Sequence, residues 1–161
     1  MTPRFGQPAR PDTRYRRRPG AYAVLWRDGR VLLTHQDAPE PEFQLPGGGI
    51  DPGESPLRAL HREVWEETGW SIAGARLIGS YHRFCYMPDY GFHAEKRCMI
   101  WLARPVLRLS APAEPGHSAH WFAPDAALSR LADPGSRHML RRVLGDWLPT
   151  GPGTRRGRRL T

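Results

Sequence analysis

The stretch over residues 47–70 constrains the fold most, because it joins a glycine-rich turn to a short amphipathic helix. Ser55 is a favourable N-cap, and Pro56 suits the first helical position, where no backbone donor is needed. Gly69 stands where helices commonly end on a left-handed residue. The pattern therefore predicts a helix over residues 56–68. Its expected apolar face is Leu57, Leu60 and Val64.

Three glutamates of this helix share one side. Glu63, Glu66 and Glu67 are spaced i, i+3 and i+4, which places their carboxylates on adjacent turns. Such like charges weaken an isolated helix by roughly a few tenths of a kcal/mol per pair. Arg58 and Arg62 offset only part of this repulsion. The cluster is therefore either a solvated acidic face or an all-oxygen site of the kind that hard divalent cations prefer.

The acidic helix and the glycines before it resemble the Nudix box, a motif with fixed gaps between its residues. The matching positions are Gly48, Glu54, Arg62, Glu63, Val64, Glu66, Glu67, Thr68 and Gly69. The chain departs from the motif at Trp70, where an aliphatic residue is usual, and this apolar exchange should affect packing more than chemistry. The order of expected strands around the box also fits the family, from about Gly20 to about Leu148.

The resemblance implies hydrolysis of a nucleoside diphosphate linked to another group, with Mg²⁺ or Mn²⁺ as cofactor. By position, Glu63 and Glu67 would be the main metal ligands, and Glu66 a further ligand or the general base. The carbonyl of Gly47 would be a backbone ligand. A small nucleotide-type molecule is the implied substrate.

Two further positions carry roles implied by the family. Glu54 and Arg62 match an ion pair that fixes the helix to its loop, and Glu54 could also reach the metal through water. Many relatives use another glutamate outside the box as the base. Glu114 and Glu95 are the candidates here, and the absence of any outside base is the third alternative.

Histidines are expected at the surface or in the core rather than as ligands. Many relatives carry an acid just ahead of the tryptophan at position 121, where this chain has His117 and Ser118. His35, His61, His120 and His138 also stand alone in the sequence.

Candidate substrate-binding residues follow the box. Arg83 and Lys96 could contact phosphates, and Tyr86 could stack on a base, because stacking tolerates any base. Solvated charge and core packing are the alternatives for these side chains. The other aromatic residues that could stack are Tyr81, Phe84, Tyr90 and Phe92.

The two cysteines allow a rival metal hypothesis. If a hairpin turned near residues 91–92, Cys85 and Cys98 would face each other and could hold zinc with His82 and His93. The spacing is not a recognised zinc pattern, so two reduced core cysteines are the main expectation, and a disulfide is not expected.

The charge distribution predicts one domain between two basic tails. The net charge is +8, of which the arginine-rich residues 1–18 contribute +5 and the C-terminal tail +4, so the remaining body is close to neutral. We expect a flexible tail over 1–19, a domain over 20–148 and a second flexible tail over 149–161. The tails are solvated ends or weak attractors of RNA or anionic substrates.

No apolar run approaches the length that spans a bilayer, and no signal-peptide segment is apparent, which predicts a cytoplasmic protein without membrane contact. A homodimer is one candidate oligomeric state.

Strands and helices are mixed without regular βαβ alternation. Strands are expected over 21–26, 31–35, 71–84, 96–103 and 119–122, and further helices over 124–131 and 136–148. This order predicts an α/β fold, an α/β/α sandwich with a mixed sheet.

Three functions are compatible with these features. The first is the metal-dependent pyrophosphohydrolase, favoured by the complete acid set. The second is a Nudix-fold module that binds a nucleotide or RNA without cleaving it, suggested by the basic tails. The third is an isomerase of prenyl diphosphates, for which the sequence offers no additional Cys-Glu arrangement.

Overall fold

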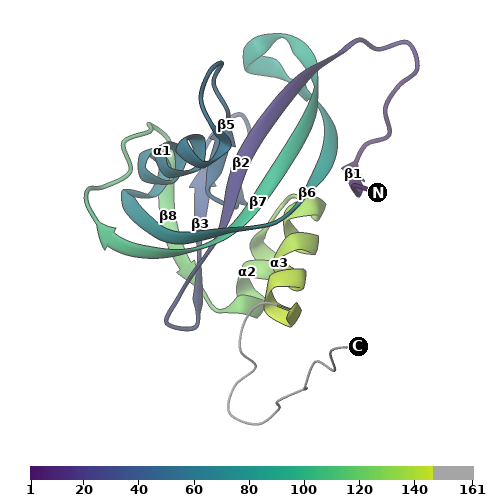
Figure 1. Ribbon diagram of the computed structural model, residues 1–161. Helices are drawn as coiled ribbons and strands as arrows, with labels where there is room; N and C mark the ends of the chain where they lie inside the picture. Colours follow the sequence, from purple (N-terminus) through teal and green to yellow (C-terminus); the bar gives the residue numbers. More distant parts are fainter. Residues whose placement is uncertain (147–161) are drawn as a thin grey trace.

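A computed structural model describes residues 1–146 of the chain (Figure 1). The strands are β1 (Arg4–Gly6), β2 (Tyr15–Arg27), β3 (Arg30–Gln36), β4 (Glu42–Gln44), β5 (Gly47–Gly49), β6 (Trp70–Met87), β7 (Phe92–Arg108) and β8 (His117–Phe122). The helices are α1 (Pro56–Thr68), α2 (Pro124–Arg130) and α3 (Pro134–Asp146), with a 3₁₀ turn at Pro88–Tyr90. In the described part of the chain, no helix is both long and apolar enough to cross a bilayer.

The strands form one mixed sheet in the order β1-β6-β7-β2-β3-β4, with β5 on β2 and β8 on β3. β6 and β7 form a long antiparallel hairpin, whereas β2 runs parallel to β7. Helix α1 covers one face of the sheet, and α2 and α3 cover the other (Figure 1). This arrangement confirms the predicted α/β/α sandwich with a mixed sheet.

Helix α1 begins and ends where the sequence predicts. The Ser55 hydroxyl accepts a hydrogen bond from the backbone N–H of Arg58 at 3.2 Å. At the other end, Gly69 has a φ of 75° and its N–H donates to the carbonyl of Trp65. A Cβ on Gly69 would lie 1.8 Å from the Ser110 carbonyl oxygen, so the loop after β7 can pack onto the helix end only because this residue is glycine.

The buried stripe of α1 differs from the prediction at one end. Leu60 and Val64 are fully buried, but Leu57 remains 46% exposed. Burial instead extends to Glu67 and Thr68 in the last turn. The chain after β7 covers that turn, because the backbone N–H groups of residues 113 and 114 both donate to the carbonyl of Glu66.

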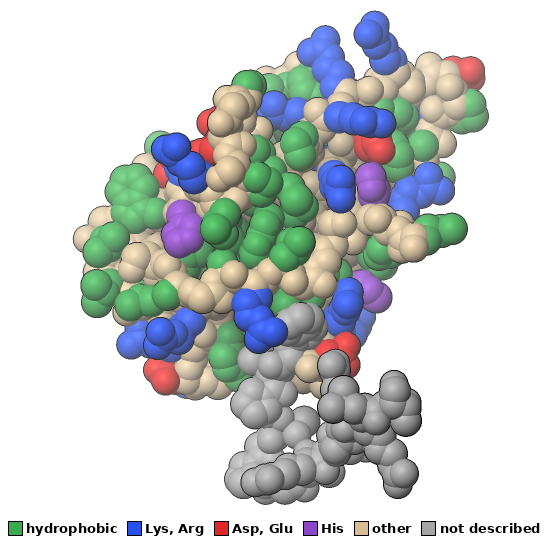
Figure 2. Space-filling view, viewed as in Figure 1, with side chains coloured by type: hydrophobic (Ala, Val, Ile, Leu, Met, Phe, Trp, Pro, Cys, Tyr) green, Lys and Arg blue, Asp and Glu red, His purple; other side chains and the backbone are tan. Residues whose placement is uncertain are grey.

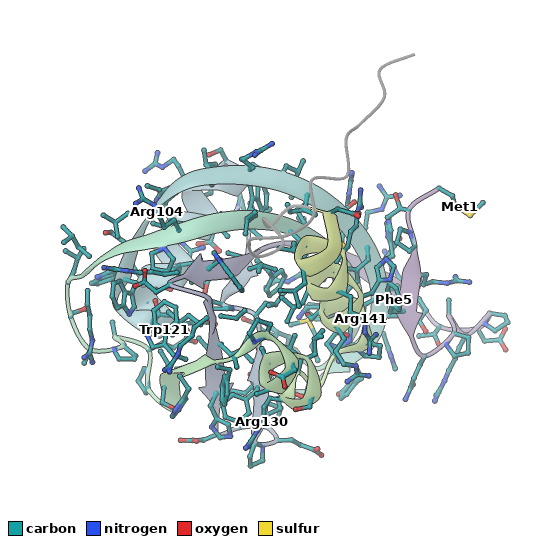
Figure 3. The ribbon with its side chains drawn as sticks, turned by 90° about the horizontal axis from the view of Figure 1, so that it is seen from below. Met1, Phe5, Arg104, Trp121, Arg130 and Arg141 are labelled. Carbon is teal, nitrogen blue, oxygen red and sulfur yellow. The ribbon has the colours of Figure 1, made fainter. Side chains whose placement is uncertain are left out.

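The N-terminal arginine-rich segment is more regular than expected. Residues 4–6 pair with β6, and residues 15–18 extend β2 along β7, so the expected boundary at residue 19 falls inside a strand. Phe5 packs against Tyr81 and His138 beside α3 (Figure 3). The charge pattern could not predict this order, because ladder hydrogen bonds involve the backbone of any residue. Several Lys and Arg side chains lie at the upper right of the molecule, near the N-terminal segment and the start of β2 (Figure 2).

The hairpin β6–β7 sets the cysteines apart. The chain reverses at Pro88–Tyr90 and Gly91, so Cys85 lies opposite Ala94 and Cys98 lies opposite Tyr81. Both cysteines are free. The zinc alternative required the two cysteines to face each other, but the register sets them four residues apart. Neither belongs to a cluster of potential metal ligands within residues 1–146, which leaves the zinc hypothesis without support.

Several element boundaries also differ from the prediction, among them those of β7 and α3. β7 continues to Arg108, into a stretch expected as a loop, because it remains paired with the start of β6. Helix α3 begins at Pro134, two residues before the predicted start, and its buried residues include Met139, Leu140 and Val143. Trp147, Leu148 and the tail over 149–161 lie outside the described residues.

Candidate active site

Glu67 lies deepest of the α1 carboxylates, with only 5% of the residue exposed. Its Oε2 accepts hydrogen bonds from the Gly47 N–H at 3.1 Å and from the Thr34 hydroxyl at 3.4 Å. These contacts join the helix to β5 and β3. They also fix the direction in which the second oxygen, Oε1, points.

The glycine turn approaches the helix and its neighbouring strand too closely for any side chain. Gly47 has a φ of 145°, and a Cβ there would lie 2.2 Å from the carbonyl oxygen of Ala21. A Cβ on Gly48 would lie 2.5 Å from the carboxyl group of Glu63. Gly47 therefore leaves no room for a side chain beside β2, and a side chain at Gly48 would have to displace the carboxyl group of Glu63.

Arg62 joins acidic groups of α1 to the loop before it. Its Nε and Nη2 each donate to one oxygen of Glu54 at 2.8 Å, a bidentate pair. Its Nη1 donates to Glu63 at 2.8 Å and to Glu66 at 3.2 Å. Nη2 also donates to the carbonyl of Gly49 at 3.1 Å. Arg62 thus holds the loop, the glycine turn and two carboxylates in one arrangement.

Glu114 reaches the same cluster from the loop before β8. Glu114 belongs to two groups of potential metal ligands, and within each group the ligand atoms lie within 4.8 Å of one another. One group is Glu63, Glu66 and Glu114, and the other is Glu67, Glu114 and His117. Oxygen-rich groups of this kind fit a hard divalent cation.

The burial of these carboxylates changes their acidity. Burial raises the pKa of Glu67 well above its ordinary value of 4.5, and the neighbouring Glu63 and Glu114 raise it further, although the Gly47 amide lowers it. Burial also raises the pKa of Glu63, against the opposing effect of Arg62. Hydrogen bonds from Arg62 instead lower the pKa of Glu54 to about 2.

These shifts predict how stability depends on pH in cation-free protein. Folded Glu67 and Glu63 hold protons that the unfolded chain releases above pH 4.5, so the free energy of unfolding should fall as the pH rises from there. The fall ends once the pH passes the raised pKa values. The lowered pKa of Glu54 has the opposite effect: it stabilises the folded protein, and this contribution is lost as the pH falls from 4.5 towards 2.

The measurement is chemical denaturation in the presence of a chelator, over a pH series from about 5 to 8. Glu67→Gln should reduce the decline, because Gln releases no proton on unfolding. Glu40→Gln, in an exposed loop, is the matched control and should keep the wild-type slope. An unchanged slope in Glu67→Gln would contradict the assignment of the decline to this carboxyl.

The carboxylates line one wall of a cleft of about 400 Å³. The glycines at positions 47–49 also line it, as do Arg18, Arg83 and Lys96. Arg83 is held by Asp133, whose Oδ1 lies 3.6 Å from the guanidinium. The cleft therefore presents carboxylates, bare backbone and cationic groups to the same volume.

Most of the predicted site residues meet in this cleft. Among those lining it are Gly47, Glu63, Glu67, Arg83, Tyr86, Lys96 and Glu114. Glu66, Glu54 and Arg62 are joined to them through the Arg62 hydrogen bonds. The N–H of Gly47 is engaged by Glu67, while the role of its carbonyl remains a prediction.

Several candidates lie elsewhere. Glu95 contacts Arg17 and His82 and does not line the cleft, so it is separated from the acidic cluster. Tyr81 is buried and donates a hydrogen bond to Asp133, which removes it from the stacking candidates. Phe84 and Phe92 do not line the cleft either. The ring of Tyr15 packs against Phe84, and the guanidinium of Arg16 lies over the ring of Phe92. Of the five aromatic candidates, Tyr86 and Tyr90 line the cleft.

His117 is the main residue that the sequence did not predict at the site. Its Nε2 lies 3.7 Å from Oε1 of Glu67, so the ring lies beside the acidic cluster, while the prediction that it is not a ligand stays a prediction. The available signal was its place ahead of Trp121, where relatives carry an acid. Thr34 and Arg18 gave no such signal, because strand pairing alone brings them to the cleft.

Known proteins have sequences similar to that of this chain. A sequence model described as NUDIX domain matches residues 16–143. The 8-oxo-(d)GTP phosphatase of Mycolicibacterium smegmatis is 31% identical over 137 residues, covering 77% of this chain and 40% of that protein. The RNA pyrophosphohydrolase of Photorhabdus laumondii is 34% identical over 96 residues, covering 60% of this chain and 47% of that protein. This chain thus spans less than half the length of either curated relative.

A solved structure extends the similarity to the whole fold. The MutT NUDIX hydrolase from Burkholderia pseudomallei is 30% identical and has a TM-score of 0.61. The match covers 80% of this chain and 98% of that one.

Proposed function

This chain belongs to the NUDIX family, and we propose that it is a hydrolase that cleaves a pyrophosphate bond with the help of a divalent cation. The proposed substrate is a nucleoside diphosphate linked to another group, such as a nucleotide or nucleotide sugar. One observation supports this most directly: carboxylates and cationic side chains face the same cleft, with bare glycine backbone between them.

The donor set fits Mg²⁺ or Mn²⁺. Glu63, Glu66, Glu67 and Glu114 offer oxygens from two directions, and the Gly47 carbonyl is the proposed backbone ligand. When bound, the cation screens the phosphate charge and makes a water more acidic. Without it, the cluster carries several carboxylates against the single guanidinium of Arg62.

The protein's own groups would then position the substrate. Arg18, Arg83 and Lys96 are placed to bind phosphate oxygens, because they line the cleft that the carboxylates also line. Tyr86 and Tyr90 could stack on a base at its outer end. Glu66 and Glu114 are the two candidates for the group that accepts a proton from the attacking water.

The rigid frame around these groups supports turnover rather than binding alone. Arg62 and Glu54 fix α1 to its loop, and Thr34 and Gly47 fix Glu67, so the carboxylates are held before any ligand arrives. A module that only binds nucleotide or RNA is the alternative, and the arginine at position 18 in the cleft is the feature that favours it. The cytoplasmic location and the homodimer remain predictions.

A substrate panel tests the proposal. We expect cation-dependent hydrolysis of at least one member of a set that includes 8-oxo-dGTP, ordinary nucleoside triphosphates, nucleotide sugars, dinucleoside polyphosphates and 5′-triphosphate RNA. Chromatography of the products identifies which phosphorus bond was cut. Folded protein that turns over none of these with Mg²⁺ or Mn²⁺, yet binds some of them, would favour the binding module.

A further inference from the structure

One ring nitrogen lies among the carboxylate oxygens of the cleft. His117 is the first residue of β8, and only 14% of its side chain is exposed. Its Nε2 lies 3.7 Å from Oε1 of Glu67, and its Nδ1 lies 4.0 Å from Oε1 of Glu114. One potential ligand atom from each of the three residues lies within 4.8 Å of the other two.

The other nitrogen of the ring fixes its orientation. Nδ1 lies 3.3 Å from the carbonyl oxygen of Pro115, an acceptor that requires Nδ1 to carry the proton. With Nδ1 as the donor, a neutral ring has its free lone pair on Nε2, the nitrogen nearest Glu67. Metal-binding histidines are usually held in this way, with the second nitrogen donating to a backbone carbonyl.

Glu67 shows the same division between an anchored atom and a free one. Its Oε2 accepts from the Gly47 N–H and the Thr34 hydroxyl, whereas Oε1 is the atom closest to His117. Each of the two side chains thus uses one polar atom to fix its position and leaves the other directed at a common point.

We propose that His117, Glu67 and Glu114 form a mixed nitrogen and oxygen site that binds a first-row transition ion in preference to Mg²⁺. The inference rests on the proposed cation-dependent function and adds the identity of the ion. Imidazole suits transition ions such as Co²⁺ and Zn²⁺, whereas Mg²⁺ favours oxygen ligands and gives up its waters reluctantly. The neighbouring group of Glu63, Glu66 and Glu114 has only oxygens and remains suited to Mg²⁺.

A competing explanation treats His117 as a counter-charge. A protonated ring beside Glu67 would offset part of the carboxylate charge without binding an ion. In that case the loss of the ring would alter the affinity for all divalent cations by the same factor. Selectivity between ions is therefore the quantity that separates the two explanations.

The experiment measures ion binding without turnover. Co²⁺ is titrated into the full chain and followed by its visible absorption, and Mg²⁺ affinity is obtained by competition. His117→Glu, which replaces the nitrogen by oxygen ligands, should lower the Co²⁺ to Mg²⁺ affinity ratio at least about tenfold. His117→Gln should lower the same affinity ratio. Because glutamine adds no charge, this variant remains informative if the glutamate variant fails to fold.

The matched control is His120→Gln, on the same strand. His120 contacts Ser118 and Phe43 and belongs to neither ligand group, so its loss should leave the affinity ratio unchanged. An unchanged ratio in both folded His117 variants would overturn the mixed site and leave the proposed function intact. Wild-type protein that binds neither Co²⁺ nor Mg²⁺ would overturn both.

Discussion

Replacing Glu67 by glutamine is expected to lower kcat/KM for the best substrate by at least about a hundredfold, while the fold is kept. The side-chain carbonyl of glutamine can still accept the hydrogen bonds from the Gly47 N–H and the Thr34 hydroxyl, so the local packing survives. The negative charge is lost from the candidate ligand group of Glu67, Glu114 and His117. The substitution therefore removes the cation-binding charge with little change of shape.

Two measurements accompany the Glu67→Gln assay. Circular dichroism and denaturation should show a protein at least as stable as wild type without cations, because the buried carboxyl no longer has to be accommodated. Glu40→Gln, in the exposed loop, should retain wild-type turnover. Turnover close to wild type in a folded Glu67→Gln protein would refute the placement of the reaction at this carboxylate.

Replacing Arg62 by lysine has the second largest expected effect, a loss of activity of about ten- to a hundredfold. The guanidinium makes a bidentate pair with Glu54 and also donates to Glu63, Glu66 and the Gly49 carbonyl. An ammonium group is a single compact charge and cannot bridge these acceptors in one plane. The carboxylates of α1 would then lose their fixed spacing, although the net charge is conserved.

Arg58→Lys is the control for this substitution. Arg58 lies one turn earlier on α1, is exposed, and its described hydrogen bond to Ser55 is made by the backbone rather than the guanidinium. Its exchange should leave kcat/KM unchanged. If Arg62→Lys also kept full activity and the same affinity for divalent cations, the fixed spacing of the carboxylates would not be important for the reaction.

The local signals in the sequence predicted the helix and its acidic face well. Helix α1 begins after Ser55 and ends before Gly69 as expected, because capping and left-handed termination depend on a few neighbouring residues. The tight turn at Asp28 and Gly29 also adopts the positive φ angles that hairpin turns require. The departure at Trp70 is accommodated by packing, since its ring lies edge-on to that of Trp121.

Contacts between distant strands were not predictable in the same way. The arginine-rich start of the chain becomes part of β1 and β2 because neighbouring strands offer free backbone groups, and side-chain composition does not report this. The hairpin register that separates Cys85 from Cys98 depends on where the turn falls, and a shift of a few residues changes every cross-strand neighbour.

The sequence by itself determined the acidic helix, the glycine turn before it and the family, because these depend on residue types at fixed short spacings. Only the tertiary structure decided which distant groups meet them. Glu114 and His117 reach Glu67 because the loop after β7 docks on the end of α1, where Gly69 leaves room for the backbone. Arg18 and Lys96 face the same cleft because β2 and β7 pair in parallel and place both side chains on one side of the sheet. The spacing of residues along the chain does not predict such long-range contacts, because strand register and the packing of the helices on the sheet decide them.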